Sequence, residues 1–153
     1  MTRSMAREIA VLLGFSLTSN TEDTDACLDR FFEEEHYASM ASENEAFAEF
    51  PDRRQMEYIR NVVRLIAEHR DELDARIETY ARGWKVSRID RTASAILRCA
   101  MCEILWLPDV PTATAINEAV ELAKKYEDED IVAFINGILG SFVRAEIEKS
   151  GEA

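Results

Sequence analysis

The sequence has little of what breaks helices, spans membranes or crosslinks secreted domains. Only 5 Gly and 3 Pro occur among 153 residues, so long helices with short connections are expected. No apolar run reaches the roughly 18 residues that a membrane span needs, and the N-terminus lacks the small-residue cleavage site of a signal peptide. Three cysteines, an odd number outside any disulfide framework, fit a reducing cytoplasm. With 47% hydrophobic residues, the chain is predicted to fold as a single domain with a substantial core.

Negative charge is concentrated in one segment of the chain. The formal net charge is −12, which by itself argues against binding to nucleic acid. Residues 21–51, however, contain ten acidic residues and one basic residue, whereas residues 76–98 contain six basic and two acidic residues. The charge of the whole chain therefore says little about any one face of the protein.

Apolar residues recur with a period near 3.6 along most of the chain, which predicts an all-α bundle of about six or seven helices. Helices are expected over residues 3–17, 26–35, 51–80 with a split near EHRDEL, 88–107, 112–126 and 130–148. The segment "YASMASENEAFAEFPD", residues 37–52, is predicted to form an irregular or weakly helical connection. Candidate N-caps are Thr24 or Asp25, Ser87 or Asp90, and Asp130. The expected core includes Ile96, Leu97, Ala100, Ile116, Val120, Leu139 and Phe142.

Motifs for catalysis or metal binding are incomplete. The four carboxylates of "EDED" at residues 127–130 precede a helix, whose N-terminus favours negative charge, and no serine elbow, glycine loop or histidine accompanies them. Cys99 and Cys102 form a CxxC pair inside an apolar helix, away from both histidines, so core packing is favoured over metal or redox chemistry. We expect neither an enzyme nor a metal or other cofactor.

The first helix carries a possible nucleic-acid surface. Arg7, Val11 and Phe15 follow one another at one-turn intervals, away from the main apolar stripe. An arginine beside an aromatic ring on an outward face suits stacking on nucleobases. The alternative is that another helix covers this face, and the pattern alone favours that alternative.

Three segments together resemble the NusB family of bacterial transcription antitermination factors. "SRIDRTASAILRCAMCEIL" and "DVPTATAINEAVELAKKYEDEDIVAFINGIL" are similar to the C-terminal half of that family, and "AREIAVLLGFSL" is similar to its first helix. The resemblance extends over residues 3–139 and is weakest in the middle. It implies an all-helical NusB-like fold in which two helical subdomains, about 1–80 and 81–148, pack together.

The same resemblance implies a function. Members of the family bind boxA-type RNA in nascent ribosomal transcripts, together with the small-subunit ribosomal protein that acts as NusE, and join an RNA polymerase antitermination complex. The basic segment 76–98 could contribute to the surface for that protein. The positions that match the RNA contacts of the family are Arg3, Arg7, Phe15, Asp130 and Phe134.

Several residues depart from the family pattern. The first helix begins "TRSMAR" instead of a run of arginines, and Phe15 lacks the hydroxyl of the usual tyrosine. Between Asp130 and Phe134 the chain reads Ile-Val-Ala, where the family often has a hydroxyl and a cation. Each lost phosphate contact weakens RNA binding, so the RNA affinity is expected to be low without the protein partner.

Two other interpretations stay open at this point. The chain could be a protein-binding helical module that has lost its RNA contacts. It could also be the NusB-like domain of a ribosomal RNA methyltransferase, although the sequence ends at Ala153 without a catalytic domain.

Overall fold

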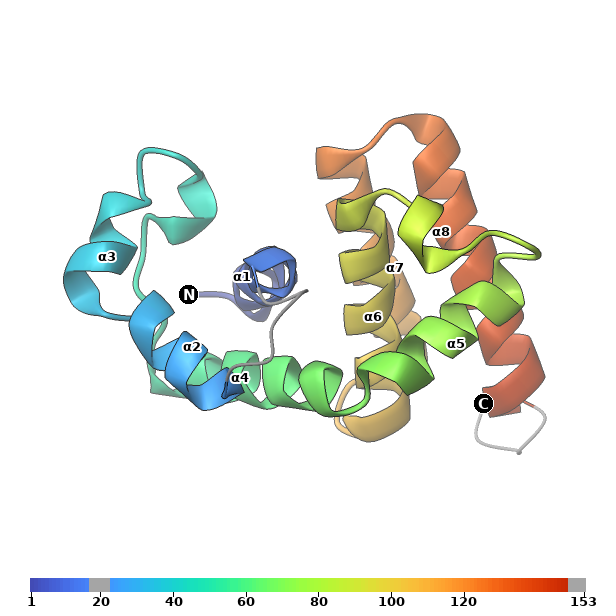
Figure 1. The fold of residues 1–153 in the computed structure, drawn as a ribbon, viewed down its shortest axis with the longest axis horizontal. Coiled ribbons are helices and arrows are strands. Elements are labelled where there is room, and N and C mark those ends of the chain that lie inside the picture. Colours follow the sequence, from blue (N-terminus) through green and yellow to red (C-terminus); the bar gives the residue numbers. More distant parts are fainter. Residues whose placement is uncertain (17–22, 149–153) are drawn as a thin grey trace. The chain divides into compact units, whose positions relative to one another are not determined.

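The computed structural model describes residues 1–16 and 23–148, apart from the side chains of Phe15 and Ser16, and this part of the chain is helical without strands (Figure 1). Its α-helices are α1 (Arg3–Ser16), α2 (Thr24–Phe31), α3 (Glu34–Ser39), α4 (Arg53–Glu68), α5 (Arg70–Tyr80), α6 (Arg91–Trp106), α7 (Thr112–Tyr126) and α8 (Glu129–Phe142). Two 3₁₀ turns, Glu45–Phe47 and Val86–Arg88, and a π-helical segment η3, Val143–Glu148, complete it. The all-α prediction is confirmed, and no helix of the described residues is long and apolar enough to cross a membrane.

Most helix boundaries agree with the apolar periodicity, and the exceptions have local causes. The long 51–80 pattern is split at His69, whose backbone (φ −108°, ψ 24°) leaves the helical region between α4 and α5. Helix α2 is capped by Asp23, which accepts a hydrogen bond from the Asp25 amide (3.1 Å), so neither Thr24 nor Asp25 is its N-cap. It also ends at Phe31, and α3 follows as a separate helix, which spans the expected end of that helix and the start of the connection expected to be irregular or weakly helical. A six-residue helix is too short to show a periodic apolar stripe.

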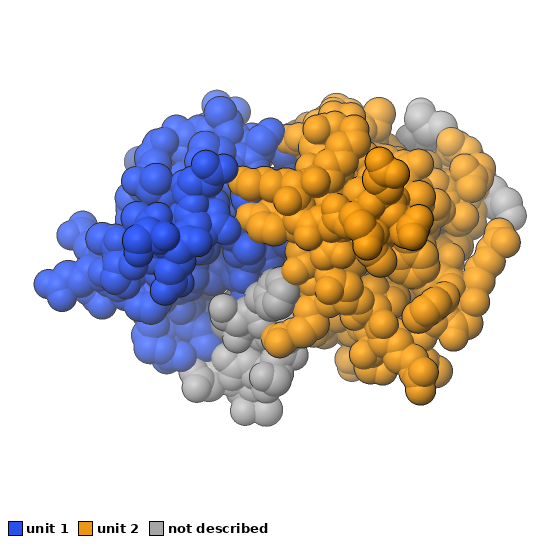
Figure 2. Space-filling view, turned by 90° about the horizontal axis from the view of Figure 1, so that it is seen from above, with its two compact units in different colours: residues 1–68 blue, residues 69–153 orange. Residues whose placement is uncertain are grey.

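The chain divides into two compact units, Met1–Glu68 and His69–Ala153 (Figure 2). This division is earlier in the sequence than the expected boundary near residue 80, because α5 packs with α6 and α8. Polar contacts hold α5 there: Arg98 Nε donates to Asp74 Oδ1 (2.7 Å) and Arg76 Nε donates to Glu146 Oε1 (2.9 Å).

The first unit is built on the pairing of α1 with α4 and of α2 with α4. Ile9 and Leu13 of α1 are buried, as are Ile59 and Val62 of α4. The acidic segment is partly neutralised within the unit, because Arg60 pairs with Asp29 (2.9 Å) and Arg64 with Asp25 (2.5 Å). Tyr37 packs among four phenylalanine rings, Phe31, Phe32, Phe47 and Phe50.

The second unit surrounds α6, which contacts α5, α7 and α8. Every residue of α6 from position 93 to position 103 is buried, as expected for a central helix that is apolar on more than one side. Asp90 caps it by accepting from the Ala93 amide (3.1 Å). Five of the seven predicted core residues are buried: Ile96, Leu97, Ala100, Leu139 and Phe142. Ile116 and Val120 are only half-buried, and Val120 lines an open groove with Val132 of α8.

Phe142 offers a test of this core. Its side chain is fully buried, so Phe142→Ala should lower the free energy of unfolding by about 3–5 kcal/mol through lost burial and a cavity. Phe50→Ala is the control, because the Phe50 ring is 45% exposed and should lose much less. Urea unfolding followed by helical circular dichroism measures both variants. Equal losses would contradict the placement of Phe142 in the core.

Candidate nucleic-acid interface

In the first unit, two arginines of α1 lie over the same aromatic ring. The Arg3 guanidinium carbon is 4.2 Å from the centre of the Tyr58 ring, and that of Arg7 is 5.7 Å away. Arg3 Nε also donates to Gln55 Oε1 of α4 (2.7 Å). These cation–π and hydrogen-bond contacts restrict the guanidinium groups to one place on the surface of α4. Arg3 stays partly exposed, whereas Arg7 is 3% exposed.

The expectation of an outward Arg7–Val11–Phe15 face is wrong for its first two members. Arg7 and Val11 are 3% and 2% exposed, and all residues from position 6 to position 11 are buried. Six consecutive residues exceed one helical turn, so α1 is covered on every side there, in part by α4. The alternative of a covered face is therefore correct for Arg7 and Val11. Phe15 lies in α1, but its side chain is outside the described part of the structure.

In the second unit, the acids around the start of α8 have separate roles. Asp128, and not Asp130, is the N-cap of α8, because its Oδ1 accepts from the Ile131 amide (3.0 Å). Asp130 is exposed in the first turn, so its carboxylate is available to a ligand. Glu127 hydrogen-bonds to the Asp90 side chain, and burial first, then this neighbour, raises its pKa to about 7.

Phe134 is one turn beyond Asp130 on α8 and is joined by an aromatic residue that the helix pattern did not indicate. The ring centres of Trp84 and Phe134 are 6.2 Å apart, at an edge-to-face angle of 70°. Trp84 is 53% exposed. It follows Arg82 and Gly83, which both have positive φ (48° and 96°), and this tight turn presents the ring beside α8. In the sequence, this aromatic neighbour was indicated by an isolated tryptophan in "GWK", a segment that interrupts the helical pattern.

The five predicted contact residues thus fall into two groups. Arg3, Arg7 and the backbone of Phe15 belong to α1 in the first unit, and Asp130 and Phe134 belong to α8 in the second. The basic segment 76–98 contains both arginines that are paired with carboxylates and cations that are exposed. Arg76 pairs with Glu72 (3.3 Å) and with Glu146, and Arg98 is buried against Asp74. Arg82, Lys85 and Arg88 are exposed.

The cysteine pair is part of the core. Cys99 and Cys102 are free thiols at 2% and 0% exposure. Burial, with a smaller effect of Glu103, raises the pKa of Cys102 to about 12, so its thiolate is disfavoured as a nucleophile or ligand. Within residues 1–16 and 23–148, no group of three or more His, Cys, Asp or Glu side chains could hold a metal ion.

Comparison with known proteins assigns the chain to a family. A model of the NusB family matches residues 4–144. The chain belongs to the NusB family. The transcription antitermination protein NusB of Acetivibrio thermocellus is 37% identical over 147 residues, 96% of this chain and 92% of that protein. The protein of the same name from Thermoanaerobacter sp. is 48% identical over 99 residues, 65% of this chain and 70% of that protein.

A solved structure agrees with the fold. A crystal structure of the antitermination factors NusB and NusE in complex with dsRNA contains a chain that superposes with a TM-score of 0.70 at 23% identity, covering 94% of this chain and 96% of that one. The expected NusB-like, all-helical fold is therefore confirmed.

The carboxyl pair of Glu127 and Asp90 predicts a pH-dependent stability. The pKa of Glu127 is about 7 in the folded protein, against an ordinary value of 4.5. Between these values, the unfolded chain loses its proton before the folded one does, so the free energy of unfolding should fall as the pH rises from 4.5 to 7. Glu127→Gln should reduce this fall and stabilise the protein at pH 8. Urea unfolding at pH 5 and pH 8 measures the difference.

Glu129→Gln serves as the control, because Glu129 is an exposed carboxylate of the same turn. It should keep the wild-type pH dependence. An unchanged pH dependence in Glu127→Gln would show that the protonation of Glu127 does not control the stability in this pH range.

Proposed function

We propose that this chain is a bacterial transcription antitermination factor, which binds boxA-type RNA together with the ribosomal protein that acts as NusE and joins the RNA polymerase antitermination complex in the cytoplasm. It acts by binding and not as an enzyme. The observation that carries the proposal is the surface at the start of α8, where the exposed carboxylate of Asp130 lies one turn before half-buried Phe134, whose ring contacts the exposed ring of Trp84. Two observations support the proposal. Its relatives include transcription antitermination proteins, and a chain with the same fold occurs in a solved complex of NusB and NusE with dsRNA.

The proposed contacts suit single-stranded RNA. Unstacked bases bind to aromatic rings and are recognised by hydrogen bonds at their edges, roles that Phe134 and the exposed carboxylate of Asp130 can fill. Arg3 is the phosphate contact of α1, because its guanidinium is both oriented by Gln55 and partly exposed. Buried Arg7 supports RNA binding by completing the packing on Tyr58, and Phe15 provides a further ring at the end of α1.

The charge of the protein explains why a partner is needed. The net charge is −12, and several of its arginines are paired with carboxylates inside their own unit, among them Arg60, Arg64, Arg76 and Arg98. Long-range repulsion therefore opposes the approach of RNA. A basic ribosomal protein bound nearby supplies the cations that the "TRSMAR" start of this chain lacks.

The two arginines of α1 should respond differently to truncation. Arg3→Ala should weaken RNA binding and reduce the slope of log affinity against log salt by about 0.7, the loss of one single-strand phosphate contact, with little loss of stability. Arg7→Ala should instead lower the free energy of unfolding by about 1–3 kcal/mol, because it removes a buried, bonded group. Salt-dependent RNA titrations and urea unfolding measure both effects.

Arg53→Ala is the control for charge alone, since Arg53 is 95% exposed and its Nε lies 3.7 Å from Glu57 Oε1 on its own helix. It should change neither quantity appreciably. RNA affinity that is equally insensitive to Arg3→Ala and Arg53→Ala would remove α1 from the RNA surface.

The partner should strengthen RNA binding measurably. We expect the NusE protein to raise the affinity for boxA RNA at least about tenfold, a coupling free energy of about 1.4 kcal/mol. Fluorescence anisotropy of a labelled boxA oligonucleotide, with and without the partner, measures this, and a scrambled oligonucleotide provides the control. Partner binding without any effect on RNA affinity would instead favour a purely protein-binding module.

A further inference from the structure

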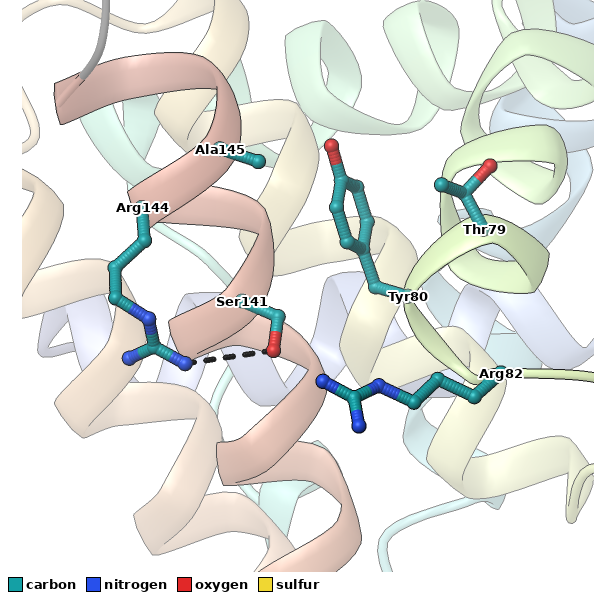
Figure 3. Close-up of a pocket in the computed structure, with 6 residues that line it drawn as sticks. All are labelled: Thr79, Tyr80, Arg82, Ser141, Arg144 and Ala145. Carbon is teal, nitrogen blue, oxygen red and sulfur yellow. Dashed lines mark hydrogen bonds between the residues drawn. The ribbon is translucent and has the colours of Figure 1, made fainter.

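A second feature of the C-terminal unit is a pocket between the end of α5 and the end of α8 (Figure 3). Its volume is about 340 Å³. Six residues line it: Thr79, Tyr80, Arg82, Ser141, Arg144 and Ala145. Two arginines reach it from different elements, Arg82 from the turn after α5 and Arg144 from η3, and both side chains extend toward Ser141 (Figure 3).

The two arginines of this pocket have no carboxylate partner in the described part of the chain. Neither Arg82 nor Arg144 forms an ion pair with a carboxylate of residues 1–16 or 23–148. Two acids lie on the same helical segment, Glu146 and Glu148. Glu146 is already engaged, because it accepts hydrogen bonds from Arg76 Nε (2.9 Å) and from the Tyr80 hydroxyl (2.5 Å), and Glu148 is exposed without an ion pair to Arg144. In a chain with a net charge of −12, two guanidinium groups that lie in one pocket without a carboxylate partner among the described residues indicate an anionic ligand.

Both arginines lie in backbone segments of unusual conformation. Arg82 has a φ of 48°, a left-handed conformation that residues other than glycine adopt rarely and that clusters at ligand sites. Arg144 lies in a π-helical segment, which is also frequent at functional sites. Gly140 gives the Arg144 guanidinium room, because a Cβ at position 140 would be 3.2 Å from Arg144 Nη1.

A hydroxyl group completes the set of donors. Arg144 Nη2 donates to Ser141 Oγ at 3.4 Å, which leaves the Ser141 O–H as a donor to a ligand. Two guanidinium groups and one hydroxyl match the acceptor oxygens of a phosphate group, which arginine binds in a forked geometry.

We propose that this pocket binds a backbone phosphate of the RNA strand whose bases contact Phe134 and Trp84. The proposal rests on the proposed RNA-binding function and extends its surface along α8. Phe134 and Ser141 are seven residues apart, so they share one helix face about 10 Å apart along the axis. Between them Gly137 is exposed, and a Cβ there would meet nothing within 4 Å. A strand stacked at the aromatic pair can therefore continue along α8 to the arginines.

The test is RNA binding by the full chain, with and without the ribosomal partner, over a range of salt concentrations. The double variant Arg82→Asn, Arg144→Gln removes both guanidinium groups, and asparagine tolerates the left-handed backbone at position 82. It should bind a boxA oligonucleotide about tenfold more weakly, with a salt slope reduced by about 0.7 for each lost contact. The variant Arg82→Lys, Arg144→Lys keeps the charge but not the forked geometry, and should keep the salt slope while losing affinity.

Two control variants separate this inference from the proposed function. Lys124→Gln removes a cation of the same unit that already contacts Glu121 (3.3 Å), and it should leave RNA affinity unchanged. Phe134→Ala tests the aromatic contact. Weaker binding by Phe134→Ala with unchanged binding by the double arginine variant would overturn the phosphate pocket and leave the proposed function standing. A wild-type chain that binds no RNA, even with the partner, would overturn both.

Two further results would reassign the pocket. Loss of affinity for the ribosomal protein, with RNA affinity intact, would make it a protein-binding site. Titration with inorganic phosphate at constant ionic strength, followed by the amide NMR signals of Gly83 and Ser141, tests for a free anion. Shifts that disappear in the double arginine variant, without any change in RNA affinity, would assign the pocket to free phosphate and overturn the assignment to RNA.

Discussion

The contact between Arg98 and Asp74 is the interaction on which the C-terminal unit most depends. Arg98 is 6% exposed in the middle of α6, and its Nε donates to Asp74 Oδ1 of α5 at 2.7 Å. Arg70 Nε lies 3.4 Å from the other oxygen of the same carboxylate, without the alignment of a hydrogen bond. Burial, and then the neighbouring Arg98, lowers the pKa of Arg70. One carboxylate thus serves two guanidinium groups, and its loss would leave buried positive charge uncompensated.

The position of α5 determines where the next turn of the chain begins. Because Asp74 joins α5 to α6, and because Arg76 and Tyr80 bind Glu146, the turn after Tyr80 starts at a defined place beside α8. That turn carries Arg82 and Trp84. A buried ion pair therefore places an exposed ring and an exposed cation beside α8, although neither residue takes part in the pair.

Acidic composition in this protein is mainly a property of the first unit and of helix starts. Asp25 and Asp29 neutralise arginines of α4, Glu49 contacts the N-terminal ammonium (2.8 Å), and Asp23, Asp90 and Asp128 cap helices. These carboxylates have structural partners, so the net charge does not describe the surfaces that face a ligand. The arginines beside Ser141, which form no ion pair with the described carboxylates, are consequently more informative than the overall charge of −12.

The sequence by itself determined the helical class, the central place of α6 and the break near His69, and it limited the cap of α6 to Ser87 or Asp90, because these depend on periodicity and on contacts within a few residues. It also indicated the NusB family through segments of specific pattern. Only the tertiary structure decided that Arg7 and Val11 are buried, since a periodic stripe cannot show a second covering helix. The same holds for the choice of Asp128 over Asp130 as the cap, for the pairing of Trp84 with Phe134, and for the pocket of Arg82 and Arg144. Each joins residues of different elements, or depends on the exact residue at which a helix begins, and local periodicity contains neither kind of information.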